Sequence, residues 1–93
     1  MKACRPLFRL GRLVGTPGAL QRMRELRIDP LALVHRHHHG DWGDIDPRDR
    51  DANEAAVADG RRLLSAYAVQ GETFWVVTEA DRSATTILLP QEY

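Results

Sequence analysis

Apolar and polar residues alternate at the start of the chain and then recur at helical spacing, and this change predicts the first elements. From Leu7 to Val14 the alternation around Phe8 and Leu10 is typical of a half-buried strand. Gly11 interrupts the segment and marks a weak point or a bulge. We expect Met1–Pro6, which precede it, to be a frayed start.

Three helices follow, and each begins with the same local signal. Thr16-Pro17, Asp29-Pro30 and Asp46-Pro47 each place a capping oxygen directly before a proline at the first helical position. Apolar residues then repeat three and four positions apart. We expect the second helix to stop at Gly40 and the third at Gly60, since glycine is the usual residue just past a helix end.

The last third of the chain is rich in β-branched and aromatic residues. Leu63–Val69, Thr73–Glu79 and Ala84–Leu89 are predicted strands, separated by short turns at Gln70-Gly71 and at residues 80–83. Short turns of this kind predict a meander of antiparallel hairpins. The order is therefore β-α-α-α-β-β-β. We expect an α+β fold with a four-stranded antiparallel sheet and helices packed on one face.

Length and composition predict one small domain over residues 1–93. Thirteen Lys and Arg balance thirteen Asp and Glu, which argues against a general nucleic-acid or membrane-surface binder. Cys4 is the only cysteine, which excludes a disulfide scaffold. No apolar run approaches the roughly 20 residues of a membrane-spanning helix. We expect a cytoplasmic protein, and the absence of any nucleotide-binding glycine loop predicts no cofactor.

All four histidines lie close together, which raises the question of a metal site. On a helix, His35, His38 and His39 share one side, and imidazole suits zinc or nickel. Arg36, however, takes the place of the glutamate in the His-Glu-x-x-His pattern of zinc proteases. We therefore expect no metal, with these three histidines as weak candidates.

A second hypothesis makes His37 a general acid or base, because its ordinary pKa suits proton transfer in phosphodiester cleavage. Arg82 or Arg62 would stabilise the phosphate and Tyr67 would assist, with Arg36 and Glu79 as further candidates. The hypothesis requires the histidine helix to lie beside the sheet edge, where these side chains could converge.

A third hypothesis is a protein-binding surface. Trp42 sits in a glycine-flanked turn beside Asp41 and Asp44, where it would anchor an interface or cover a small core. Of these two roles, we favour the one in which Trp42 covers a small core. Asp81 and Arg82 form a second charged cluster on a hairpin turn and would extend the same partner-binding surface.

A longer pattern of residues runs through most of the chain. It comprises Arg36-His37, Gly40-Asp41-Trp42-Gly43-Asp44, Asn53, Leu64-Ser65-Ala66-Tyr67, Trp75-Val76-Val77-Thr78-Glu79-Ala80-Asp81-Arg82-Ser83 and Thr85-Thr86-Ile87-Leu88-Leu89-Pro90. In these residues the chain resembles a family of small bacterial proteins described as plasmid-related. The resemblance implies a mobile-element setting and assigns no activity. His37 belongs to the pattern, whereas the other histidines do not.

The order of elements is also similar to that of RelE/ParE-type toxins, some of which cleave mRNA on the ribosome. Those toxins are strongly basic, whereas this chain is neutral with an acidic middle. We therefore put first a mobile-element-associated binding or inhibitory module that acts on a host or defence protein, with a homodimer left open. The alternative is a RelE/ParE-like endoribonuclease that uses His37 and binds nucleic acid. The second alternative is metal binding through His35–His39.

Overall fold

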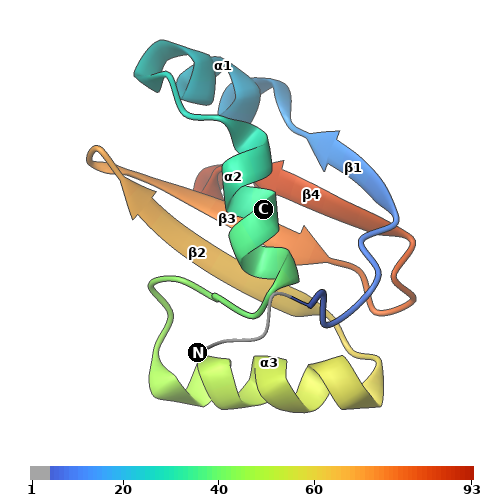
Figure 1. The fold of residues 1–93 in the computed structure, drawn as a ribbon. Helices are drawn as coiled ribbons and strands as arrows, with labels where there is room; N and C mark the ends of the chain where they lie inside the picture. The colour runs from blue at the N-terminus through green and yellow to red at the C-terminus, as the bar shows by residue number, and fades with distance from the viewer. Residues whose placement is uncertain (1–4) are drawn as a thin grey trace.

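The computed structural model describes residues 5–93 and has the predicted α+β class (Figure 1). The expected frayed start lies mostly outside the described residues, as does Cys4. The elements are β1 Arg12–Gly15, α1 Pro17–Leu26, α2 Pro30–His38, α3 Pro47–Asp59, β2 Leu63–Val69, β3 Glu72–Thr78, β4 Ala84–Leu88 and a short 3-10 helix η1 Pro90–Glu92. None of the helices described is both long and apolar enough to cross a membrane.

The three predicted helix starts are confirmed. The side chains of Thr16, Asp29 and Asp46 accept hydrogen bonds from first-turn N–H groups at 3.2, 3.0 and 2.9 Å. Each following proline stands where an N–H would have no helical partner, so it costs the helix nothing. Gly60 ends α3 in the left-handed conformation, with φ +71°.

The four strands form one mixed sheet in the order β1-β4-β3-β2. The meander of β2, β3 and β4 is antiparallel as predicted, but β1 runs parallel to β4, with Leu13 opposite Thr85. The prediction of a purely antiparallel sheet is therefore wrong. The cause is the connection through α2 and α3, which carries the chain back along the sheet, so that β1 and β2 start at the same end (Figure 1). Two hairpins then turn β4 into the direction of β2.

The first strand is also shorter than predicted. Instead of covering residues 7–14, it begins at Arg12, because Gly11 has a φ of +66° and breaks the extended chain. A Cβ at Gly11 would lie 2.4 Å from the backbone of Ser83, so no side chain fits there. Phe8, expected on the strand, lies in the segment before it and packs against rings from α2 and the following loop.

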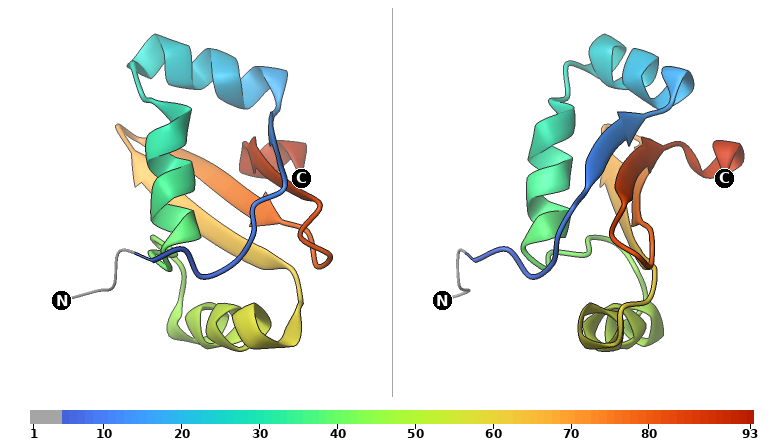
Figure 2. Two further views of the ribbon diagram at one scale, coloured as in Figure 1. Left: turned by 45° about the vertical axis from the view of Figure 1, so that its right-hand side comes forward. Right: turned by 90° about the vertical axis from the view of Figure 1, so that its right-hand side faces the viewer.

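The helices do not form one even layer. α2 crosses one face of the sheet, whereas α1 lies at one end of the molecule and α3 at the other (Figures 1 and 2). The main core gathers beneath α2 and comprises Ala19, Met23, Leu33, Val34, Tyr67, Phe74, Val76, Ile87 and Leu89. A smaller core of Trp42, Ala56 and Leu63 joins α3 to the sheet.

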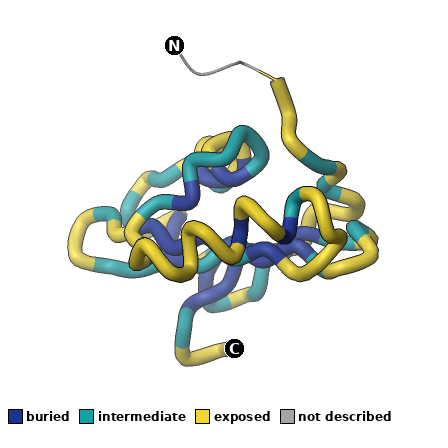
Figure 3. The backbone as a smooth tube through the Cα atoms, turned by 90° about the horizontal axis from the view of Figure 1, so that it is seen from below, coloured by how far each residue is buried: buried dark blue, intermediate teal, exposed yellow. Residues whose placement is uncertain are grey.

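Asn53 fastens α3 to the outer edge of β2. Its Nδ2 donates to the Leu64 carbonyl at 2.7 Å, and its Oδ1 accepts from the Leu64 N–H at 3.2 Å. The amide therefore pairs with β2 as another strand would. α3 is otherwise largely exposed, with only Asn53 and Ala56 buried (Figure 3).

The loop between α2 and α3 closes the rest of this edge. The Ala66 N–H donates to the Trp42 carbonyl at 3.1 Å, and the Asp44 N–H donates to the Ala66 carbonyl at 2.6 Å. The Asp44 carboxylate also accepts from the Ala68 N–H at 2.9 Å. The outward N–H and C=O groups of Leu64 and Ala66 and the N–H of Ala68 are thus paired within the molecule.

Replacing Asn53 should open this edge. We expect Asn53→Ala to lower the free energy of unfolding by about 2 kcal/mol, because both backbone groups of Leu64 lose their partner. The control is Asp51→Ala, an exposed change on the same helix, which should cost less than about 0.5 kcal/mol. Urea unfolding at constant m-value measures both. Equal effects of the two substitutions would contradict the assigned role of Asn53.

Candidate functional site

His37 lies completely buried between α2 and the sheet. Its Nδ1 is 2.6 Å from Ser65 Oγ on β2, and its Nε2 is 2.8 Å from Thr78 Oγ1 on β3. Thr78 Oγ1 is in turn 2.7 Å from Thr85 Oγ1 on β4, whose hydroxyl donates to the Leu10 carbonyl at 2.8 Å. These five groups, which we call the His37 network, join one helix, three strands and the N-terminal segment.

The direction of the hydrogen bonds in the His37 network follows from its last member. The Leu10 carbonyl can only accept, so Thr85 gives it the one proton of its hydroxyl group. Thr78 must then donate to Thr85, and His37 Nε2 must donate to Thr78. His37 is therefore the neutral tautomer protonated at Nε2, and its Nδ1 accepts from Ser65. Neither ring nitrogen is left for a substrate.

The surroundings of His37 also keep it neutral. Burial lowers its pKa to about 3, and the positive charges of His38 and Arg82 act in the same direction. The rings of Phe8 and Trp42 meet the imidazole edge-on, with centroids 5.2 and 5.6 Å away. A histidine in this state does not exchange protons near neutral pH, so the geometry gives it a structural role.

The other residues of the catalytic hypothesis are only partly brought together. The Arg36 guanidinium lies over the Tyr67 ring, 4.4 Å from its centroid, and pairs with Asp41 at 2.7 Å. The Tyr67 hydroxyl donates to the Asp41 carbonyl at 2.5 Å, and burial raises the Tyr67 pKa. Glu79 follows the far end of β3 and pairs with Arg62 at 3.3 Å. These side chains do not share a cleft with His37.

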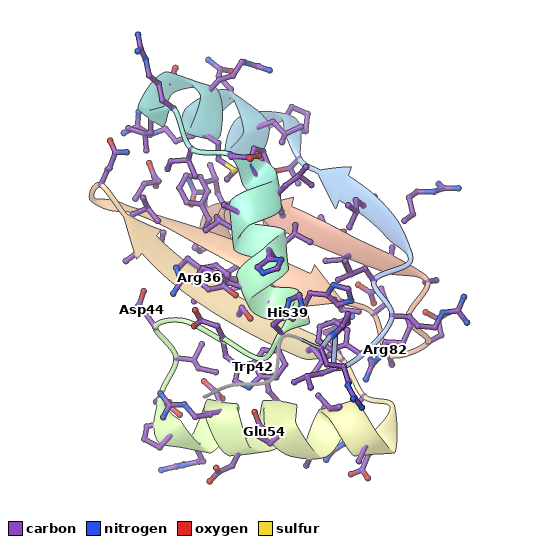
Figure 4. All side chains as sticks on the ribbon, in the orientation of Figure 1. Arg36, His39, Trp42, Asp44, Glu54 and Arg82 are labelled. Carbon is purple, nitrogen blue, oxygen red and sulfur yellow. The ribbon has the colours of Figure 1, made fainter. Side chains whose placement is uncertain are left out.

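Arg82 is used inside the molecule (Figure 4). Its guanidinium donates to the carbonyls of Ala56 and Arg61 at the end of α3, at 2.8 and 2.7 Å, and to that of Glu79 at 3.1 Å. It also lies over the ring of Phe8, 5.7 Å from the centroid. Arg82 therefore ties the end of α3 to the turn between β3 and β4, and these donors are not directed at an external phosphate.

Trp42 lies in the smaller core and is only 3% exposed. Its indole N–H donates to Glu54 Oε2 at 2.6 Å across the gap to α3 (Figure 4). This position agrees with the favoured interpretation of Trp42 as a cover for a small core. An indole so deeply placed offers little surface to a partner.

The acidic residues proposed for partner binding all bond to other groups of this chain. Asp41 pairs with Arg36 and also accepts from the Gly43 N–H at 3.2 Å. The Asp44 carboxylate holds β2, as described above, and Asp81 accepts from a backbone N–H in its own hairpin turn at 3.0 Å. Their carboxylates are therefore engaged within the molecule.

The rings of the three other histidines lie beside one another, with the centroids of His38 and His39 5.3 Å apart, but two of the rings bond to backbone carbonyls. The His38 Nε2 donates to the Phe8 carbonyl at 2.8 Å, and the His39 Nδ1 donates to the His35 carbonyl at 2.9 Å. The rings of His35 and His39 lie 4.2 Å apart. Within residues 5–93, no three His, Cys, Asp or Glu side chains are grouped so that they could hold a metal ion.

A pocket of about 470 Å³ opens beside Trp42, between the end of α2 and α3. It is lined by Leu7, His39, Gly40, Asp41, Trp42, Gly43, Arg50 and Glu54. The sequence interpretation anticipated His39, Asp41 and Trp42 but missed Arg50 and Glu54, which only the packing of α3 brings there. The two carboxylates that line the pocket, those of Asp41 and Glu54, already bond to Arg36 and to the Trp42 indole.

Comparisons of the chain with protein-family models, with curated proteins and with solved structures found no match. The resemblance to plasmid-related proteins therefore stays a prediction, and function has to be inferred from the geometry.

Acid should destabilise the protein through His37. Its pKa is about 3 in the folded state and 6.5 in the unfolded chain, so the unfolded chain binds the extra proton between these values. The contribution of His37 to the free energy of unfolding is therefore fully present above about pH 6.5. It falls as the pH drops, by about 2 kcal/mol between about pH 7 and about pH 5.

The matched variant is His37→Gln, which removes this titration but keeps the other acidic and basic groups, including His38. We expect the difference in pH slope between wild type and variant to correspond to about one proton. Urea unfolding at several pH values measures it. In addition, ¹⁵N spectra of the wild-type imidazole should show protonation at Nε2 alone. Parallel pH curves, or a protonated Nδ1, would contradict the assignment.

Arg82→Lys tests the fork of hydrogen bonds at the end of α3. Lysine keeps the charge but cannot reach carbonyls on several sides, so we expect a loss of about 2 kcal/mol in the free energy of unfolding. Arg48→Lys, an exposed change on α3, should cost less than about 0.5 kcal/mol. Thermal and urea unfolding compare the two. If Arg82→Lys is as stable as the control, the carbonyl contacts are not important for stability.

Proposed function

We propose that this chain is a non-catalytic module that binds a protein partner through the open edge of β1. The observation that carries the proposal is the contrast between the two edges of the sheet. The β2 edge is closed by Asn53 and by the loop around Trp42 and Asp44. Within residues 5–93, nothing of this kind covers β1, which forms the right-hand edge in Figure 1.

The backbone of β1 offers hydrogen-bonding groups to another chain. The Arg12 N–H donates to Ser83 and the Thr16 N–H to Ile87, so alternate residues of β1 face β4. Strand geometry then turns the N–H and C=O groups of Leu13 and Gly15 outward. In the described part of the chain these outward groups have no partner.

The side chains of β1 add apolar surface to this edge. Leu13 is 48% and Val14 is 40% exposed, one on each face of the sheet. An unpaired strand edge with exposed apolar side chains is a template for pairing with another chain. Proteins usually cover such an edge. This protein covers the β2 edge with specific hydrogen bonds but leaves the β1 edge unpaired among the described residues.

The buried polar residues support binding over catalysis. The ring nitrogens of His37 and the guanidinium of Arg82 have partners inside the protein, which leaves the endoribonuclease alternative without its assigned general acid or base and without one of its phosphate-binding arginines. For the partner we propose a host or defence protein, because the resemblance to plasmid-related proteins implies a mobile-element setting.

The proposal predicts a stable complex that depends on the β1 edge. Tagged protein is purified from a bacterial host, and the complex is sized and its components are identified by mass spectrometry. We expect one stoichiometric partner with the wild type. Leu13→Lys should reduce the recovered partner about tenfold, because a charge on an edge strand opposes pairing.

The matched control is Leu31→Lys, which changes an equally apolar, 61% exposed residue on α2. It should leave the recovered partner unchanged. Purified protein should also leave cellular RNA intact. New RNA ends made by the purified protein, or the absence of any stoichiometric partner, would overturn the proposed function.

A further inference from the structure

Charge is unevenly distributed in this neutral chain. Every charged residue in the segment 5–24 is an arginine: Arg5, Arg9, Arg12, Arg22 and Arg24. Residues 41–59, by contrast, are mainly acidic and form the loop and α3, which close the opposite edge of the sheet. The open strand edge therefore lies in the basic part of the sequence.

Two of these arginines flank the open edge. Arg12 begins β1, and Arg9 precedes it by three residues; both side chains are exposed. The ion pairs of the described residues involve other arginines, namely Arg22, Arg36, Arg61 and Arg62. The charges of Arg9 and Arg12 are thus not neutralised within the described protein, and they favour an acidic ligand.

We propose that β1 accepts an extended segment of a partner protein as a fifth strand, and that this segment is apolar at its centre and acidic beside it. The inference rests on the proposed function and adds the chemistry of the partner. The outward groups of Leu13 and Gly15 would form the backbone hydrogen bonds. Leu13 and Val14 would contact apolar side chains on the two faces, and Arg9 and Arg12 would pair with carboxylates.

A second copy of this chain fits the edge less well. Antiparallel pairing of two β1 strands around Leu13 would place Arg12 of each copy diagonally across from Arg12 of the other. Like charges across adjacent strands are destabilising, and charged side chains on edge strands prevent self-association in many proteins. Arg12 thus repels a second copy but attracts an acidic strand, so the charge pattern selects a different partner.

Two synthetic peptides of equal length provide the test, one alternating valine with glutamate and the other valine with lysine. Each is titrated into the ¹⁵N-labelled protein, and amide shifts and hydrogen exchange are followed. We expect the glutamate peptide to slow exchange at the Leu13 and Gly15 amides and to bind about tenfold more tightly than the lysine peptide. Added salt should weaken this preference.

Two substitutions separate the backbone and charge contributions. Leu13→Pro removes an outward N–H but none that faces β4, so we expect a folded protein that no longer binds the peptide. Arg12→Glu should reverse the preference between the peptides, whereas Arg48→Glu on α3 should leave it unchanged. The amide spectrum of each variant reports whether it is folded.

Failure of this inference differs from failure of the proposed function. Equal binding of the two peptides, no binding, or unchanged binding by folded Leu13→Pro would overturn the acidic fifth strand. If the complex from host cells still depends on Leu13 in that case, the proposed function stands and the partner binds with a folded surface. If the glutamate peptide binds as expected but cells yield no partner, the fifth-strand inference is supported and the proposed function falls.

Discussion

The buried hydrogen-bond network through His37 is the constraint on which the rest of the structure depends. It joins α2, β2, β3, β4 and the segment before β1, and every donor and acceptor in it points in one direction. Among the described residues, no buried side-chain nitrogen or oxygen is left without a partner. Because an unpaired polar group in a core is costly, the network fixes how α2 lies on the sheet. A one-residue shift of any of these strands would turn its Ser or Thr to the other face.

The same use of polar groups explains why the most reactive-looking residues bond to other parts of the chain. Trp42, Asn53 and Asp44 complete the β2 edge and the small core, while Arg82 holds the end of α3. In a domain of this size, few apolar residues are available to hold α3, which contributes mainly alanines. Directed hydrogen bonds supply the attachment that a larger core would otherwise give. The polar and aromatic residues that are concentrated in this part of the sequence therefore hold the fold together.

Local chemistry made the helices and hairpins predictable, because a capping oxygen followed by proline acts within one turn and a short turn joins adjacent strands. The direction of β1 was not predictable from local signals, since it depends on how α2 and α3 carry the chain back along the sheet. The burial of His37 did have a signal: it lies three and four residues after Val34 and Leu33, the buried face of α2. The contacts of Arg82 and Glu54 with distant segments had no such signal.

Under the proposed function, the unpaired β1 edge is significant because the opposite edge, β2, is closed within the molecule. A four-stranded sheet has two edges, and this protein uses an amide, a carboxylate and a backbone bridge to close the one beside its acidic segment. The other edge keeps its outward backbone groups and exposed apolar side chains but is flanked by arginines. Bare edges tend to pair indiscriminately, and charge is one of the few ways to make such pairing selective. Under the proposed function, zero net charge therefore hides an uneven distribution of charge: Asp44 helps to close the β2 edge, whereas Arg9 and Arg12 would select what can join the β1 edge.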